Sequence, residues 1–170
     1  GYRLYFHDTH HRMVTDPASM ARYDLADYDG VLAYGRTLQE VYEKAGRVAR
    51  VWTWHEAADT RVFKPLPASE QSPCRERGDI VWVGNWGDDE RSAELREFLI
   101  RPVARLKVRA TVYGVRYPEE ARQHLEAAGI QYKGWLPNFR TPQAFAAHKV
   151  TVHVPRGPYV RALPGIPTIR

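Results

Sequence analysis

The chain has 170 residues and a formal net charge of +5; 44% of its residues are hydrophobic and 26% are charged, as is normal for a globular protein. No apolar run approaches the roughly 18–20 residues that would cross a bilayer, so we expect no membrane span. The single cysteine, Cys74, excludes an intramolecular disulfide and favours a cytoplasmic setting.

The charge is unevenly distributed along the chain. Residues 1–78 contain 11 Lys/Arg and 11 Asp/Glu, whereas residues 79–170 contain 14 Lys/Arg and 9 Asp/Glu. An anionic partner is therefore expected on the second half. The basic residues form no run or arm, so a phosphate-bearing small molecule is the expected partner and nucleic acid is not.

Residues 5–12, YFHDTHHR, place three histidines and an aspartate at the end of a short apolar run. A metal site, an acid/base cluster and a polar loop all fit. A strand would point His7 and Asp8 to opposite faces. The later histidines at 55, 124, 148 and 153 are isolated, so no second cluster completes a metal shell and we expect no metal. A histidine at a strand end suits general-base chemistry, because its unperturbed pKa lies near neutrality.

Residues 29–54 are predicted to form a β-α-β unit. A strand over 29–35 is followed by a helix over 36–46, in which Leu38, Val41 and Tyr42 have helical spacing, and by a strand over 47–54 that includes Trp52 as an apolar candidate. This order implies a parallel pair of strands. Residues 64–78, KPLPASEQSPCRERG, lack periodicity; we expect an interdomain linker, with a long surface loop as the alternative.

After the linker, strands predicted at 80–83, 110–113, 130–133 and 150–154 alternate with helices at 90–106, 118–129 and 141–148. In the helix over 90–106, Leu95, Phe98, Leu99 and Leu106 are expected near one face, with a possible kink at Pro102. Thr141 is the expected N-cap of the last helix. The alternation predicts an α/β fold with parallel sheets and helices on both faces.

Ligands of such sheets bind beyond the carboxyl ends of the strands. The segment GNWGDDER follows the strand at 80–83, and its glycine turn before a helix suits phosphate, with Arg91 adding a charge-assisted contact. It is neither a dinucleotide fingerprint nor a P-loop. The acids at 88, 89 and 90 have the alternative role of capping the helix.

Two further segments follow strand ends. Trp135 either stacks on a base or packs in the core, and the backbone of Gly134 to Pro137 suits contact with a base edge in both cases. The segment after the last strand contains Arg156, Tyr159 and Arg161 among several glycines and prolines. We favour a ligand role for it over an ordinary solvated loop, because it continues from a strand end.

Taken in order, these segments resemble a GT-B glycosyltransferase of the GT4-like kind, and among them the CgeB-like (spore-maturation-type) enzymes. YFHDTHHR is similar to the histidine-bearing segment of the first Rossmann-like domain, DIVWVGNWGDDER to the first strand of the second domain, and YKGWLPNFRTPQAFAAHKVTVHVPR to the block near the nucleotide base. ALPGIPTIR resembles the run-up to an acidic donor-binding segment, which would start just beyond Arg170, so we expect a central fragment of a longer enzyme.

The resemblance implies a first, acceptor-side domain that ends in residues 1–63, a linker at 64–78 and a donor-binding domain at 79–170. It implies sugar transfer from a nucleotide-sugar donor to an unknown acceptor, with no cofactor and no metal. The candidate catalytic residues are His10, Asp8 and His11. The candidate donor-binding residues are Gly84, Asn85 and Arg91 at the diphosphate, Gly134, Trp135, Leu136 and Pro137 at the base, and Arg156, Tyr159 and Arg161 at the donor edge. A non-catalytic nucleotide-sugar-binding module and a metal-dependent hydrolase remain as alternatives.

Overall fold

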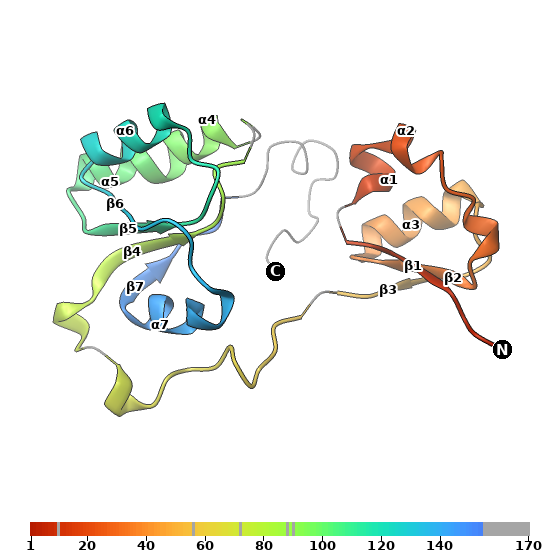
Figure 1. Ribbon diagram of the computed structural model, residues 1–170, viewed down its shortest axis with the longest axis horizontal. Coiled ribbons are helices and arrows are strands. Elements are labelled where there is room, and N and C mark those ends of the chain that lie inside the picture. The colour runs from red at the N-terminus through yellow and green to blue at the C-terminus, as the bar shows by residue number, and fades with distance from the viewer. Residues whose placement is uncertain (10, 56, 72, 88, 90, 155–170) are drawn as a thin grey trace. The chain divides into compact units, whose positions relative to one another are not determined.

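The computed structural model describes residues 1–9, 11–55, 57–71, 73–87, 89 and 91–154. The chain forms two compact units, and the boundary between them follows Ala57. Each unit contains a parallel sheet with helices packed against it (Figure 1). The α/β fold class predicted from the sequence is confirmed. In the described part of the chain, no helix is both long enough and apolar enough to cross a membrane.

The first unit has a three-stranded sheet. Its strands are β1 (Tyr5–Asp8), β2 (Gly30–Ala33) and β3 (Val51–Thr53), paired in parallel in that order. The helices α1 (Arg12–Thr15), α2 (Pro17–Met20) and α3 (Arg36–Ala45) lie on one face of this sheet, and a 3-10 turn, η1 (Leu25–Asp27), precedes β2 (Figure 1). The buried side chains between sheet and helices include Met20, Leu25, Val31, Leu38 and Tyr42.

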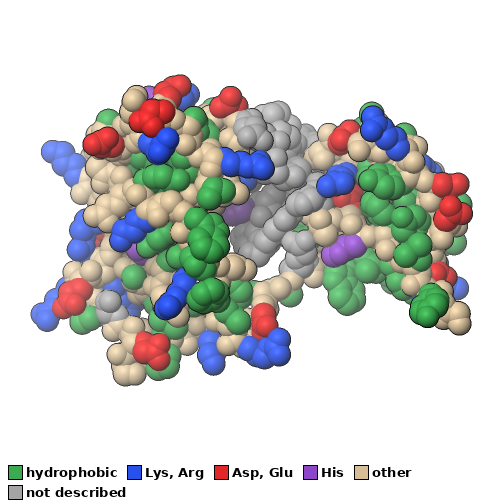
Figure 2. Space-filling view, viewed as in Figure 1, with side chains coloured by type: hydrophobic (Ala, Val, Ile, Leu, Met, Phe, Trp, Pro, Cys, Tyr) green, Lys and Arg blue, Asp and Glu red, His purple; other side chains and the backbone are tan. Residues whose placement is uncertain are grey.

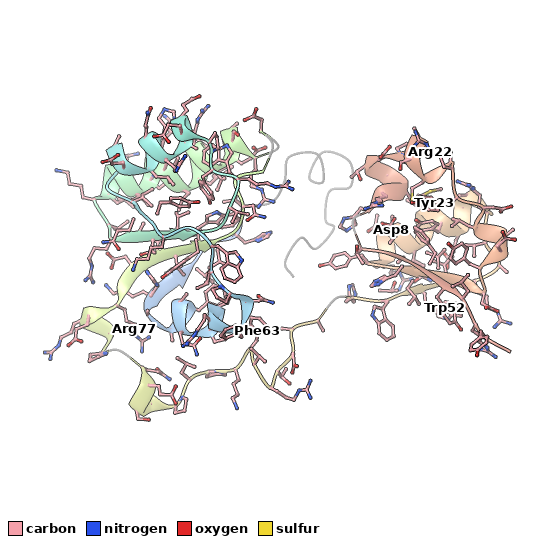
Figure 3. All side chains as sticks on the ribbon, viewed as in Figure 1. Asp8, Arg22, Tyr23, Trp52, Phe63 and Arg77 are labelled. Atoms are coloured by element: carbon pink, nitrogen blue, oxygen red, sulfur yellow. The ribbon has the colours of Figure 1, made fainter. Side chains whose placement is uncertain are left out.

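The predicted β-α-β unit is present, with differences at its ends. Leu38 and Tyr42 are buried as their helical spacing predicted. Trp52, an apolar candidate of the last predicted strand, is 39% exposed and projects from the sheet face opposite the helices (Figure 3). No helix was predicted in the segment after Arg12. The signal for α2 was present, because Asp16 accepts a hydrogen bond from the Ser19 amide while Pro17 occupies the first turn.

The second unit has a four-stranded parallel sheet in the order β6-β5-β4-β7. Its strands are β4 (Gly78–Val83), β5 (Ala110–Tyr113), β6 (Gln131–Tyr132) and β7 (His148–Thr151). The helical segments α4 (Ser92–Leu95), α5 (Arg101–Leu106) and α6 (Glu119–Ala127) lie on one face, and α7 (Thr141–Ala146) lies on the other (Figure 1). The buried core includes Trp82, Trp86, Leu95, Val112 and Leu125.

This strand order creates a topological switch point. The chain adds β5 and then β6 on one side of β4, and it places β7 on the other side. In open α/β sheets ligands bind next to such a switch point, outside the carboxyl ends of the strands. The residues that directly follow β4 and β7 are therefore candidates for ligand contact.

The helix expected over 90–106 is interrupted by a π-helical segment, η4 (Arg96–Ile100), between α4 and α5. Leu95 and Leu99 are buried as expected, but the side chains of Phe98 and Leu106 are each 65% exposed. A π turn adds one residue to a helical turn, so the side chains that follow it face a different direction from the one they would have in a regular α-helix. The prediction for Phe98 and Leu106 was wrong because it assumed an uninterrupted 3.6-residue period.

Shorter segments complete the second unit. The residues predicted as a linker contain two 3-10 turns, η2 (Ala68–Glu70) and η3 (Cys74–Glu76). A third, η5 (Asn138–Arg140), precedes α7. Because η5 already turns the chain, Arg140 rather than Thr141 stands at the N-cap of α7, and Thr141 is buried in the first turn. The predicted capping role of Thr141 was therefore wrong.

Candidate functional site

Asp8 ends β1 and holds the turn that follows it. Its carboxylate accepts hydrogen bonds from the backbone amides of Arg12 (3.0 Å) and Met13 (3.2 Å) and from the hydroxyl of Tyr42 (2.9 Å). The side chain is 2% exposed and lies between the sheet and the helices of the first unit (Figure 3). Burial, followed by the charge of Asp8, raises the pKa of Tyr42, which keeps its hydroxyl proton available for this bond. These contacts are those of a group that positions the turn.

An aromatic ring follows each of the three strands of the first unit, and neighbouring rings of this set are in contact. The ring of His11, after β1, lies edge-on to Tyr34, after β2, with centroids 5.0 Å apart. Tyr34 is edge-on to His55, after β3, at 6.0 Å. The position of His55 just after a strand was the sequence signal for this ring contact. His11 is buried, whereas the candidate His10 lies outside the described residues.

We expect the Asp8→Ala substitution to lower the free energy of unfolding of the first unit by about 1–3 kcal/mol, because it removes a buried cap and leaves three donors without their acceptor. Urea denaturation followed by circular dichroism measures the change. Asp24→Ala is the matched control, since the Asp24 carboxylate accepts one backbone hydrogen bond at the exposed start of η1. Equal losses in the two variants would contradict the role assigned to Asp8.

In the second unit, the turn after β4 is fixed by its neighbours. The Gly84 amide donates to the carbonyl of Tyr113 (2.9 Å), and the Gly84 carbonyl accepts from the hydroxyl of Tyr117 (2.9 Å). The Asn85 side-chain oxygen accepts from the amide of Val115 (3.0 Å). For the backbone amides of Asn85 and Gly87 we find no hydrogen-bond acceptor within the described residues. Those two amides, rather than that of Gly84, are the ones that a ligand could engage.

Two tyrosine hydroxyls connect this turn to the next ones. The Tyr117 hydroxyl accepts from Nε1 of Trp82 (2.9 Å) while it donates to Gly84, and the Tyr132 hydroxyl donates to the carbonyl of Gly114 (3.0 Å). The two phenol rings are in contact, with centroids 4.7 Å apart. Burial raises the pKa of Tyr117, so its hydroxyl keeps its proton. Neither tyrosine was predicted from the sequence to have a role in the site.

Arg91 lies at the start of α4, and its side chain extends to the segment that follows β7. Its guanidinium carbon is 5.7 Å from the centroid of the Trp82 ring, and Nη1 donates to the carbonyl of Val154, after β7 (3.3 Å). Asp89, one of the acids predicted to cap this helix, accepts a hydrogen bond from the Ser92 hydroxyl (3.0 Å). This bond joins two side chains, and no side chain caps the backbone amides of α4 within the described residues.

The segment after β6 carries the candidates for base contact. Trp135 is 71% exposed, so the alternative in which it packs in the core does not apply. Leu136 and Pro137 are half-buried, and the carbonyl of Gly134 accepts from the Gly114 amide (2.8 Å). On the face of the second unit seen in Figure 2, exposed hydrophobic side chains alternate with Lys and Arg side chains. Arg156, Tyr159 and Arg161 lie outside the described residues.

A metal centre is not apparent among the residues that the structure describes, in which no group of three or more His, Cys, Asp or Glu side chains is placed to hold an ion.

His148, in β7, has a structural role, because both of its ring nitrogens are in hydrogen-bonding contact within the second unit. His148 contacts the carbonyl of Ala144 through Nδ1 (2.7 Å) and the hydroxyl of Thr111 through Nε2 (3.0 Å).

Comparisons with known proteins found one family match and similar solved structures. Residues 91–170 match the family described as Glycosyl transferase-like. The match covers just under half of the chain and falls mostly on the second unit. No curated protein matches the sequence.

The fold is shared with a solved structure, that of Anabaena Alr3699/HepE in complex with UDP and glucose. The TM-score is 0.65 at 18% sequence identity, over 91% of this chain and 47% of that one. The chain therefore spans about half the length of the structure it matches. The two comparisons support the GT-B-like fold and a glycosyl transferase-like segment at residues 91–170.

Proposed function

We propose that the chain is part of a GT-B glycosyltransferase, of the CgeB-like kind, that transfers a sugar from a nucleotide-sugar donor to an acceptor without a metal cofactor. The observation that carries the proposal is the glycosyl transferase-like match at residues 91–170, on the unit whose sheet has a switch point. The fold shared with HepE, which was solved with UDP and glucose, supports a nucleotide-sugar as the donor.

In this proposal the second unit holds the donor. The diphosphate lies after β4, where the amides of Asn85 and Gly87 donate to it and Arg91 supplies positive charge. Gly84 contributes to the shape of the turn, because a Cβ at this position would lie 2.4 Å from the ring of Trp82, so only glycine lets that ring pack against the backbone. A phosphate is a suitable ligand for such a turn because each of its oxygens accepts several hydrogen bonds.

The base lies against the loop after β6. Exposed Trp135 provides a flat apolar face for stacking, and the backbone from Gly134 to Pro137 provides polar atoms for the base edge. Arg156, Tyr159 and Arg161 complete the donor side. The first unit holds the acceptor, with His10 or His11 as the acid/base group. Asp8 acts in this scheme as a positioning residue, since it holds the turn that carries both histidines.

A thermal-shift titration of the 170-residue chain tests the proposal. UDP, GDP, ADP and the corresponding nucleotide-sugars are compared with and without EDTA, because a ligand that binds only the native state raises the melting midpoint by mass action. We expect a midpoint increase with one nucleotide series that EDTA does not change. A cooperative melt that none of these compounds shifts would refute the donor site. A shift with zinc alone would favour a metal-dependent hydrolase.

A further inference from the structure

His153 lies beside Arg91 at the switch point. Its ring centroid is 6.3 Å from that of the Trp82 ring, which is the same indole that the Arg91 guanidinium approaches at 5.7 Å. Arg91 also donates to the carbonyl of Val154, the residue that follows His153. A fixed cation and an imidazole, from segments about sixty positions apart in sequence, thus converge where β4 and β7 end.

The surroundings of this imidazole disfavour its charged form. Partial burial of the ring, followed by the positive charge of Arg91, lowers the pKa of His153. Of the other groups around the Trp82 ring in the described part of the chain, Tyr117 follows β5 and is kept neutral by burial. An anion placed against Arg91 would reverse the electrostatic effect on His153, because it would attract the proton that Arg91 repels.

We propose that His153 is a second diphosphate-binding residue of the donor site, which acts with Arg91 and takes up a proton as the diphosphate binds. The inference rests on the proposed function, since it assumes that the anion at this site is the diphosphate of a nucleotide-sugar. An imidazolium donates from a ring nitrogen to a phosphate oxygen, and this charge-assisted bond is stronger than one from neutral imidazole. His153 therefore adds its positive charge to the site only when the ligand is bound.

The sign of the pH dependence follows from this proton uptake. The bound state holds one more proton than the empty state at pH values between the two pKa values of His153. Affinity therefore rises as the pH falls through that interval, and each unit by which the ligand raises the pKa changes Kd by up to about tenfold. Above the pKa of the bound state, the dependence disappears.

Isothermal titration calorimetry on the 170-residue chain tests the proposal. The probes are UDP-, GDP- and ADP-glucose, whose diphosphate diesters keep a constant charge from pH 6 to 8, and the best binder is carried through the series. We expect its Kd to rise about 3- to 10-fold from pH 6 to 8, with proton uptake evident when buffers of different ionisation enthalpy are compared. His153→Gln should abolish both effects. His124→Gln is the matched control, on an exposed face of α6.

Two outcomes would overturn the proposal, and they differ in what else they affect. Binding that has the same pH dependence and proton uptake in His153→Gln as in the unmodified chain would exclude His153 from the site and leave the donor-binding function intact. Failure of all three nucleotide-sugars to bind a cooperatively folded chain would overturn the proposed function together with this inference.

Discussion

Replacing Arg91 with alanine is expected to weaken nucleotide-sugar binding about 10- to 100-fold, because a hydrogen bond to a charged group contributes about 1.5–3 kcal/mol. Its guanidinium stacks on Trp82 and donates to the carbonyl of Val154, so its position is fixed before any ligand arrives. Little side-chain freedom then remains to be lost on binding. Calorimetric titration with the preferred nucleotide-sugar measures the loss.

Two variants separate this effect from a general loss of positive charge. Arg91→Lys keeps the charge but not the planar fork, and an intermediate affinity is expected. Arg96→Ala removes a cation whose exposed ion pair with Glu120 contributes little, so its affinity should be nearly unchanged. If Arg91→Ala binds as tightly as Arg96→Ala, the assignment of Arg91 to the diphosphate is wrong.

Replacing Gly114 with alanine is expected to lower the free energy of unfolding of the second unit by about 2–5 kcal/mol, through steric overlap together with backbone strain. A Cβ atom at this position would lie 2.0 Å from the carbonyl oxygen of Gly84, and the backbone has a φ of +150°, which favours glycine. Relief requires the turns after β4 and β5 to move apart, so donor affinity should fall as well. Urea denaturation followed by tryptophan fluorescence reports on buried Trp82 and Trp86.

Gly129→Ala is the control for backbone strain alone. Gly129 also has a positive φ, of +71°, but no atom lies within 4 Å of the position that its Cβ would take. We expect a cost of about 1 kcal/mol and no loss of donor affinity. Equal costs for the two variants would show that the close approach of Gly114 to Gly84 has no energetic importance.

The fold class could be predicted from the sequence because it depends on patterns that are local. Strand and helix alternate, Leu38 and Tyr42 recur at helical spacing, and the strands are short apolar runs. The exposure of Phe98 could not be predicted in the same way. It depends on a π turn in a helix that also contains Pro102, and no periodic pattern in the sequence predicts such a turn.

Candidate site residues could be proposed from the sequence, but the contacts that connect them could not. The rule that ligands lie at carboxyl ends of parallel strands selected the turns at Gly84 and Gly134, and the role of these turns stays a prediction. The hydroxyl bonds of Tyr117 and Tyr132, in contrast, join positions that are 33 and 18 residues apart in sequence. Which buried hydroxyl reaches which carbonyl depends on tertiary packing, and the same is true of the ring contacts that include His55.

The bridging tyrosines have a consequence for how this site can change. The turns after β4, β5 and β6 are connected by hydrogen bonds to the carbonyls of Gly84, Gly114 and Gly134 and by the contact between two tilted phenol rings. In the proposed donor site, a substitution that reshapes one of these turns is expected to displace the turns joined to it, because residues that share partners do not contribute additively. We therefore expect the three turns to respond together, so that a change of donor preference would need compensating changes in neighbouring loops.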